Sequence, residues 1–409
     1  MRKLLIISLF LLTAVFPLAG QADSVLLGWS VRGTVRDART GKPVEAVHVR
    51  VPARNFATVT NADGEYTIKS DREITALVFS HLGYRTQTLQ PAGGEADVRL
   101  VPEATLLDEA SIISGDAREI LLAAIDRIPE NFSREPEMLG CFYRETVRKR
   151  QRYTYISEAV ARLYKTGYDK GTSRDHAALD KSRVLLSPRA GDTLSVKVQG
   201  GPAQAVVFDV VKNPDVLFSG ELLPLYQFTM DRPAYIGDRL QFVIRFQPGK
   251  VLPDWPLYSG TVYIDRERLS FTRIEMAMDL SDEYKATRAL VVRKPFSLRF
   301  HPKEVSFVIH YSEQDGLSRL SYYRSLLRFD CDWKKRLFRT GYTALNELVV
   351  TDIRDGIPRP VPRGEQFSVK DILTDRAADF FDPAFWENYN IIEPTESLEH
   401  AIGRLRKGR

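Results

Sequence analysis

The chain has 409 residues, of which 44% are hydrophobic and 27% are charged. This composition is typical of globular proteins, and the length is sufficient for two or three domains. The formal net charge of +5 is modest, and the Lys and Arg residues are scattered along the sequence. No basic run interleaves with aromatic residues, so the sequence argues against a nucleic-acid-binding protein.

The N-terminus has the pattern of a secretory signal peptide. Arg2 and Lys3 precede a continuous apolar run, and small residues follow up to Ala22. We therefore predict a signal peptide over 1–22. The apolar run is shorter than the roughly 20 residues of a membrane-spanning helix, and we expect no transmembrane segment in the mature chain. Gln21 stands where a lipoprotein signal would have Cys, so no lipid anchor is expected.

Residues 30–101 show short alternating strands separated by turn residues. Val47, Val49 and Val51 share one face of a predicted strand, and "TNADGEY" places an Asp-Gly turn before another strand. Several such strands at this spacing are typical of an antiparallel β-sandwich. Gly64 supplies the positive φ that a tight turn needs.

The segments "GTVRDARTGKPVEAVHVRV", "TNADGEY" and "LVFSHLGYRTQT" resemble the carboxypeptidase regulatory-like domain. That family has a transthyretin-like β-sandwich fold and occurs at the N-terminus of many exported Gram-negative envelope proteins. The resemblance implies an accessory module in which Asp63, Gly64, Gly83 and Tyr84 serve turns and packing. A calcium site at Asp37 or Asp63 is the alternative, although isolated carboxylates lack the dense ligand spacing of a calcium loop.

A linker and a helix are predicted over 102–131. Ser114 is a suitable N-cap for a helix from Ala117 to Ile128, in which Leu121, Ala124 and other apolar residues share one face. The sequence after this helix has neither a plug motif nor the repeated short strands of a transmembrane barrel. A TonB-dependent receptor is therefore not expected.

Residues 132–409 are predicted to form a large antiparallel β-sheet domain with a C-terminal helix. Hairpins are expected to turn at 265–268 and at 314–316, and shorter helices at 203–213 and after Thr395. The complete prediction is a mainly β protein, in which an N-terminal transthyretin/Ig-like sandwich precedes a curved sheet with few helices. This pattern resembles the half-barrel of periplasmic lipoprotein carriers and an uncharacterised group of exported envelope proteins.

One face of the predicted sheet is strongly apolar. Five residues on it could line an open concavity: Phe242, Ile244, Ile274, Met276 and Met278. Because few helices are available to cover this face, the sheet could curl around a cavity that binds a hydrophobic ligand. A sheet packed entirely by its own helices is the alternative.

Two polar motifs invite a chemical interpretation. His310 and Glu313 form His-x-x-Glu, a zinc-ligand spacing, but residues three apart on a strand point to opposite faces unless a bulge intervenes. Cys141 and Cys331 are expected in buried strands, either as two free thiols or, in an oxidising compartment, as a disulfide. No catalytic, cofactor-binding or metal-binding residue is predicted.

The sequence therefore predicts a noncatalytic exported protein of the periplasm or the outer-membrane-associated cell envelope. We expect it to bind a protein or a hydrophobic ligand through its β-domains, without a cofactor. Carbohydrate binding is the alternative, with Trp255, Tyr258, Trp386 and Tyr389 as the aromatic candidates for stacking on a glycan. A hydrolase of unknown type is a second alternative, in which Asp254 or Glu387 would supply paired carboxylates.

Overall fold

A computed structural model of the protein describes most of the chain after the predicted signal peptide. The described residues are 28–52, 56–70, 72–103, 115–192, 194–334, 338–354, 356–376, 380 and 392–407. The signal peptide at 1–22, most of the linker, Trp386, Glu387 and Tyr389 lie outside this set. The domain boundaries at 101 and 131 therefore stay predictions.

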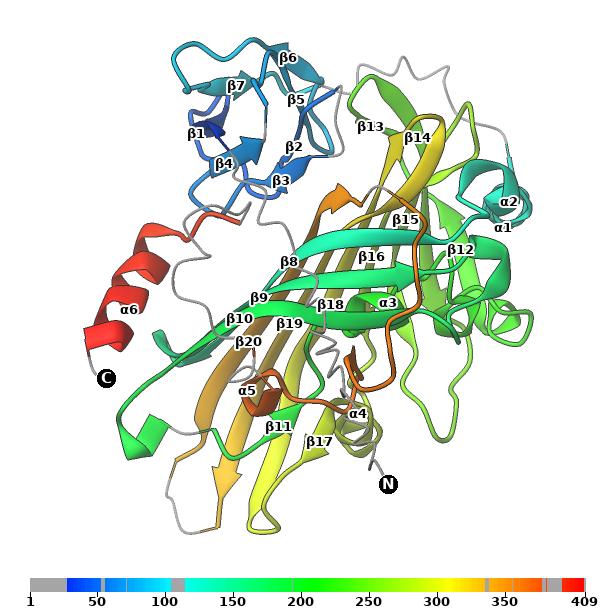
Figure 1. Ribbon diagram of the computed structural model, residues 1–409. Coiled ribbons are helices and arrows are strands. Elements are labelled where there is room, and N and C mark those ends of the chain that lie inside the picture. Colours follow the sequence, from blue (N-terminus) through cyan, green and yellow to red (C-terminus); the bar gives the residue numbers. More distant parts are fainter. Residues whose placement is uncertain are drawn as a thin grey trace, which may run out of the picture.

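The N-terminal part is a seven-stranded sandwich of two small sheets (Figure 1). One sheet has the order β4-β1-β7 and the other the order β3-β2-β5-β6. The strands are β1 (Trp29–Asp37), β2 (His48–Arg50), β3 (Ala57–Val59), β4 (Glu65–Ser70), β5 (Leu77–Ser80), β6 (Gln87–Leu89) and β7 (Val98–Leu100). The pairing of β1 with β7 is parallel, whereas an entirely antiparallel sandwich was predicted.

The predicted alternation places the sandwich core correctly. Val47, Val49 and Ile68 are fully buried between the two sheets. Gly64 has a φ of +77°, and a Cβ there would lie 2.4 Å from the carbonyl oxygen of Val35. Only glycine fits this turn, because both the backbone conformation and the close approach exclude a side chain.

The rest of the chain is built around a strongly curved, antiparallel sheet of 12 strands. Its order is β12-β14-β15-β16-β18-β19-β20-β8-β9-β10-β21, and β13 pairs with β14. The strands are β8 (Glu137–Lys149), β9 (Arg152–Lys165), β10 (His176–Leu186), β12 (Tyr226–Met230), β13 (Ala234–Ile236), β14 (Arg239–Pro248), β15 (Tyr258–Asp265), β16 (Phe271–Met278), β18 (Leu298–Gln314), β19 (Leu317–Trp333), β20 (Thr340–Ile353) and β21 (Gln366–Phe367). A separate pair joins β11 (Lys197–Val198) to β17 (Val291–Arg293).

Both predicted hairpins are confirmed. The turn between β18 and β19 has positive φ values at Asp315 (52°) and Gly316 (77°), as expected of a tight two-residue turn. The turn between β15 and β16 follows Asp265, whose carboxylate accepts hydrogen bonds from the backbone N–H groups of Glu267 and Arg268. Local turn chemistry therefore sets the register of both hairpins.

The helices differ in detail from the predictions. They are α1 (Ala117–Asp126), α2 (Ile128–Asn131), α3 (Gln204–Val207), α4 (Glu283–Leu290), α5 (Leu373–Arg376) and α6 (Glu396–Lys407). The N-cap of α1 is Asp116 instead of Ser114, because the Asp116 carboxylate accepts hydrogen bonds from two backbone N–H groups of the first turn. The helix predicted at 203–213 is a single turn, and the chain after it folds onto the sheet as irregular segments.

The inner face of the curved sheet is packed core, which corrects the expectation of an open concavity. Phe242, Ile244, Ile274, Met276 and Met278 are all buried, with at most 8% of each residue exposed. They pack with residues of α1, α4 and the irregular segment 203–226 in one large cluster. A cavity of only about 50 Å³ borders Met278 in this part of the described structure.

The sandwich lies on the outer face of the sheet, as Figure 1 shows. Val59 of β3 packs with buried residues of β8, β9, β19 and β20: Phe142, Val160, Tyr322 and Val349. A second contact joins Leu82, after β5, to Ile236 of β13 through an isolated β-bridge. The inner face is therefore covered by the chain's own irregular segments and helices, and the outer face is covered in part by the sandwich and in part by α6, which packs on β9 and β10.

Both cysteines are free and buried. Cys141 lies in β8 and Cys331 in β19, and β20 separates these two strands. Of the two alternatives, the structure has two buried thiols. Burial raises the pKa of Cys141 well above its usual value and that of Cys331 to about 12, so neither is a reactive thiolate.

Candidate functional site

A cleft lies between the sandwich and the outer face of the sheet. Its volume is about 380 Å³, within the range of small-molecule and peptide sites. The sandwich contributes His48, Arg50 and Phe56 from β2 and the β2–β3 connection, and Leu82 from the loop after β5. The sheet contributes outward-facing residues of β13, β14, β16, β18 and β19, and of the turns that join them.

Histidines from both parts meet in this cleft. The rings of His48 and His310 lie 5.5 Å apart between their centroids. The guanidinium of Arg273 lies 2.5 Å from Nε2 of His310, so this nitrogen accepts a hydrogen bond and the ring is neutral. Burial, reinforced by the positive charge of Arg273, holds the pKa of His310 well below its usual value.

Burial and the charge of Arg273 also lower the pKa values of the two sandwich histidines, His48 and His81. Burial lowers the pKa of His48 to about 4, with further lowering from His81 and Arg273. Burial and Arg273 also lower the pKa of His81 to about 4. The histidines at this junction are therefore uncharged at neutral pH, and the cleft presents ring nitrogens without positive charge.

One edge of the cleft is held by an ion-pair network that joins three hairpins. Arg239 of β14 pairs with Asp265, at 3.3 Å, and with Glu313. Arg268 pairs with the other oxygen of Glu313 at 2.7 Å. Burial would raise the pKa of Glu313, but the hydrogen bonds and charges of Arg239 and Arg268 lower it overall. Glu313 is therefore ionised and forms ion pairs with Arg239 and Arg268.

The floor of the cleft consists of hydroxyl and amide groups. Ser270 and Ser318 share a hydrogen bond of 2.9 Å, and Thr272 donates to the side chain of Gln241 at 2.7 Å. Ser321 donates to the backbone oxygen of His310 and lies 3.4 Å from Nε2 of His48. Such a surface is suited to polar groups of a ligand, because its donors and acceptors are already positioned.

The His-x-x-Glu motif lies in this cleft, but its two residues have separate partners. His310 and Glu313 both border the cleft. The register shift beside His310 leaves Ser321 of β19 as the extra residue, because His310 pairs with Tyr322 and Tyr311 with Leu320. The strand β18 therefore has no extra residue between His310 and Glu313, and their orientation to opposite faces stays a prediction. Arg273 bonds to His310, whereas Arg239 and Arg268 bond to Glu313. Within the described ranges, no group of three or more His, Cys, Asp or Glu residues could hold a metal ion.

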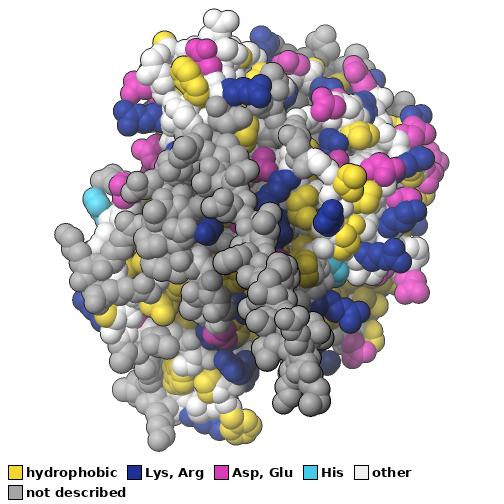
Figure 2. All heavy atoms as spheres, viewed as in Figure 1, with side chains coloured by type: hydrophobic (Ala, Val, Ile, Leu, Met, Phe, Trp, Pro, Cys, Tyr) yellow, Lys and Arg dark blue, Asp and Glu magenta, His cyan; other side chains and the backbone are white. Residues whose placement is uncertain are grey.

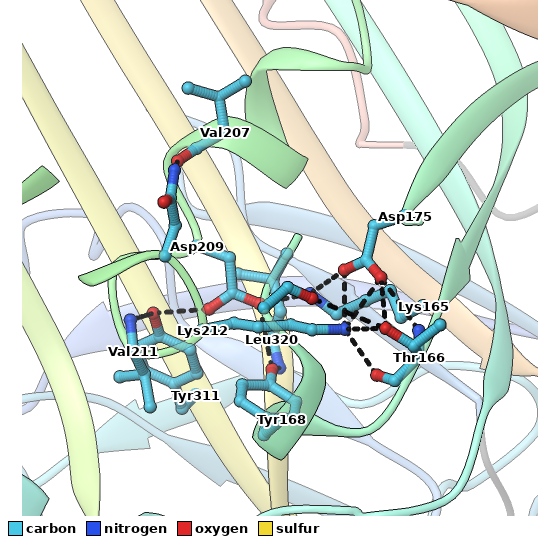
Figure 3. Close-up of polar contacts among 12 residues, drawn as sticks. Lys165, Thr166, Tyr168, Asp175, Val207, Asp209, Val211, Lys212, Tyr311 and Leu320 are labelled. Carbon is cyan, nitrogen blue, oxygen red and sulfur yellow. Dashed lines mark hydrogen bonds and ion pairs between the residues drawn. The ribbon is translucent and has the colours of Figure 1, made fainter. Parts of the chain in front are cut away.

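A second polar cluster lies beneath the sheet and is closed to solvent (Figure 3). Lys165 contacts Asp209, and Lys212 pairs with Asp175 at 2.7 Å. Tyr311 donates to the other oxygen of Asp209 at 2.9 Å. The four charged side chains are at most 3% exposed. With two cations, two anions and no solvent access, this network can hold the chain after α3 against the sheet but cannot meet a substrate.

The other candidates from the sequence are not assembled into a site. Trp255 is half exposed, but Tyr258 is buried in the core, so these two do not form an aromatic platform. The Asp37 carboxylate accepts hydrogen bonds from Thr40 and Arg39 backbone N–H groups and from the Tyr84 hydroxyl. These bonds hold the pKa of Asp37 at about 2 and give it a structural role.

The cleft residues other than His310 and Glu313 were missed from the sequence. Gln241 and Arg273 were recognised only as the polar side of alternating strands, which is also the pattern of a solvated face. His48 is a single histidine in a strand of another domain. No sequence signal showed that the sandwich would pack against this face. Its polar side chains therefore could not be recognised as the wall of a cleft.

The comparison with protein families identifies the N-terminal part. Residues 31–112 match the family model of the CarboxypepD_reg-like domain. This match confirms the resemblance inferred from the strand and turn motifs. No curated protein matches the sequence.

Solved structures were also compared. A LolA superfamily protein from Nitrosomonas europaea has 12% identity, a TM-score of 0.24, and coverage of 61% of this chain and 97% of that chain. A putative outer membrane lipoprotein-sorting protein domain from Vibrio parahaemolyticus has 11% identity, a TM-score of 0.27, and coverage of 61% and 96%. The Pseudomonas aeruginosa MucA/MucB complex has 13% identity, a TM-score of 0.18, and coverage of 60% and 100%. TM-scores this low do not establish a shared fold.

None of the helices in the described part of the chain is long and apolar enough to cross a membrane.

Proposed function

We propose that this protein is a noncatalytic, exported binding protein of the cell envelope, and that its ligand is a polar segment of a partner protein. The observation that carries the proposal is the cleft of about 380 Å³ between the sandwich and the outer face of the sheet. Ligand sites occur preferentially where domains meet, and this cleft is large enough for a few peptide residues.

The state of the charged side chains supports binding over catalysis. A general base or nucleophile needs a group that is free to react and has a pKa near the working pH. In this cleft His310 accepts a hydrogen bond from Arg273, and Glu313 is held by two arginines. The pKa values of both groups are shifted below their usual values, so neither is suited to take up a proton at neutral pH.

The polarity of the cleft selects a peptide over an acyl chain. Hydroxyl, amide and guanidinium groups form its floor and edge, whereas Phe56, Leu82 and Ile236 add apolar surface from the sandwich and β13. An extended peptide segment offers both backbone hydrogen-bonding groups and side chains to such a mixed surface. A hydrocarbon chain would displace water from these polar groups without offering hydrogen bonds in its place, which costs free energy.

Export to the envelope is part of the same proposal. It is supported by the charged N-terminal residues and apolar run of a signal peptide, and by the family of the N-terminal domain. In this arrangement the regulatory-like sandwich supplies one wall of the cleft and the sheet supplies the other.

The proposal can be tested by selecting peptides from a random displayed library on the purified mature protein. The binding of enriched synthetic peptides is then measured by titration calorimetry. Ser312 lies half-buried in the cleft wall, so Ser312→Trp should fill the cleft and reduce affinity at least tenfold. Ser306→Trp, on the same strand and face but outside the cleft, is the matched control and should retain affinity.

Two results would contradict the proposal. The first is an enriched peptide that binds Ser312→Trp and the unmodified protein equally well, because its site must then lie elsewhere. The second is a failure to enrich peptides while a glycan array yields a ligand that Ser312→Trp abolishes. That outcome would support the carbohydrate-binding alternative at the same cleft.

A further inference from the structure

The end of the sheet farthest from the sandwich has a different surface chemistry, which the proposed cleft does not use. Here the β8–β9 turn, the segment after β10 and the loops flanking β18 and β19 come together (Figure 1). We name the described residues of these loops the basic tip, comprising 148–152, 189–192, 293–299, 332–334 and 338–339. The backbone N–H of Lys334 donates a hydrogen bond to the carbonyl of Ser297 within the tip, and the N–H of Arg150 donates to Gly341, at the start of β20 next to it.

The basic tip concentrates positive charge. It contains ten Lys or Arg residues and only two acidic residues, Asp192 and Asp332. The whole chain has a net charge of +5, so the remainder of the protein is slightly negative. Ten of the 58 Lys and Arg residues of the chain therefore lie at this end, although they come from segments far apart in the sequence. Acidic residues occur at the start of α4, where Asp282 is the N-cap and Glu283 is the first helical residue.

Large apolar side chains project from the same end. Phe296 is 93% exposed and Phe338 is 79% exposed, and each lies in a loop that joins strands. The ammonium group of Lys334 lies 5.1 Å from the centre of the Phe296 ring. Leu186, at the end of β10, and Val292, in β17, are also exposed. Hydrophobic and basic side chains are both visible at the lower end of the molecule in Figure 2.

We propose that the basic tip binds the surface of a bilayer containing anionic phospholipid. Aromatic side chains that project from positively charged loops are suited to this partner, because the rings enter the headgroup region while Lys and Arg attract the lipid phosphates. The strands β18 and β9 are separated by three others, so their loops span about 20 Å at the usual spacing between strands. A soft, planar, negatively charged surface can contact all of these projecting loops at once.

A protein partner and a lipid bilayer would differ in the shape complementarity that they require of this surface. Phe296 and Phe338 project from separate loops and are 93% and 79% exposed. A protein partner would need matching pockets for both rings, whereas a bilayer requires no fixed complementary shape. The charge of the tip also matches a phospholipid surface, since ten cations face few internal anions.

The test uses the mature protein and vesicles of equal parts phosphatidylglycerol and phosphatidylethanolamine, with phosphatidylcholine vesicles for comparison. Co-sedimentation should show binding to the anionic vesicles in low salt, little binding to phosphatidylcholine, and weakening as salt is raised. The double substitution Phe296→Ser/Phe338→Ser should reduce vesicle affinity at least tenfold. Trp29→Ser/Ile357→Ser removes two exposed apolar residues elsewhere and should have little effect.

A second pair of variants tests the charge. Arg293→Glu/Lys294→Glu should abolish binding to anionic vesicles, whereas Arg36→Glu/Lys42→Glu makes the same change of charge on exposed residues of the sandwich and should retain it. The proposal is overturned if the protein does not bind the anionic vesicles in low salt. It is also overturned if the two tip variants bind like their controls, or if the tip mediates self-association without lipid. Circular dichroism melting curves confirm that each variant is folded.

Discussion

Two groups of charged and polar side chains lie on opposite faces of the same sheet and differ in their access to solvent. On the inner face, Lys165, Asp175, Asp209 and Lys212 are sealed from solvent and paired with one another (Figure 3). On the outer face, polar side chains line a cleft of about 380 Å³ that the sandwich covers incompletely. The inner network is complete without a ligand, whereas the cleft leaves space beside its prearranged polar groups. Buried charged residues that are paired with one another therefore have a structural role in this protein. The candidate binding site is identified by polar residues that border accessible space.

The largest effect is expected from introducing a charge into the apolar core of the sheet domain. Met276 is 3% exposed and packs in the main hydrophobic cluster. Met276→Glu should prevent stable folding, because an unpaired buried carboxylate has lost its hydration without gaining a partner. Circular dichroism and protease resistance provide the measurement. A folded Met276→Glu variant that binds an apolar dye would restore the idea of an open hydrophobic cavity.

Breaking the inner network should be the next most severe change. Lys212→Met leaves Asp175 buried without its closest cation, and such a loss costs about 3–5 kcal/mol of unfolding free energy. Urea denaturation measures the difference. The control is Arg127→Gln, which removes an exposed i,i+3 ion pair with Glu130 and should cost less than about 0.5 kcal/mol. Equal effects of the two substitutions would show that the buried network is not a structural lock.

The histidines of the junction predict a loss of stability in mild acid. Their pKa values are lowered on folding, to about 4 for His48 and His81, so the unfolded chain binds more protons between pH 6.5 and 4. Stability must then fall as the pH decreases through that range. Melting temperatures at pH 7 and pH 5 measure the loss. His48→Gln should reduce this pH dependence, whereas His400→Gln, on the exposed side of α6, should leave it unchanged.

The smallest expected effect comes from the edge of the cleft. Arg239 is partly exposed, and Glu313 keeps its ion pair with Arg268 when Arg239 is replaced. Arg239→Gln should therefore change the free energy of unfolding by no more than about 1 kcal/mol. Denaturation by urea is again the measurement. A loss comparable to that of Lys212→Met would mean that the cleft edge, like the inner network, is required for folding.

Much of the fold could be predicted from the sequence because local patterns decide it. Alternation identified the buried faces of the sandwich and the sheet, as Val49 and Ile274 illustrate, and turn residues such as Gly316 located the hairpins. The predicted helix at 203–213 failed because an apolar run that packs against a sheet has no need of helical periodicity. Asp209 and Lys212 interrupt that run, and these charges were the available signal for the inner network.

The candidate site could not be predicted in the same way. His48 and His310 are separated by more than half of the chain, and only the position of the sandwich on the sheet brings their rings within 5.5 Å. Domain packing depends on contacts such as Val59 with Tyr322, which no local pattern encodes. The basic tip was missed for the same reason, because its loops are distant in sequence and meet only when the sheet is assembled.

The most direct test of the binding cleft is to record the histidine ring signals by NMR while a selected peptide is added to the mature protein. His48 and His310 line the cleft, whereas His301 and His400 lie outside it and serve as internal controls. We predict saturable shifts of the His48 and His310 ring nitrogens at a one-to-one ratio, with the control signals unchanged. Shifts confined to His301 or His400, or unchanged His48 and His310 signals at saturating peptide, would contradict a binding site between the sandwich and the sheet.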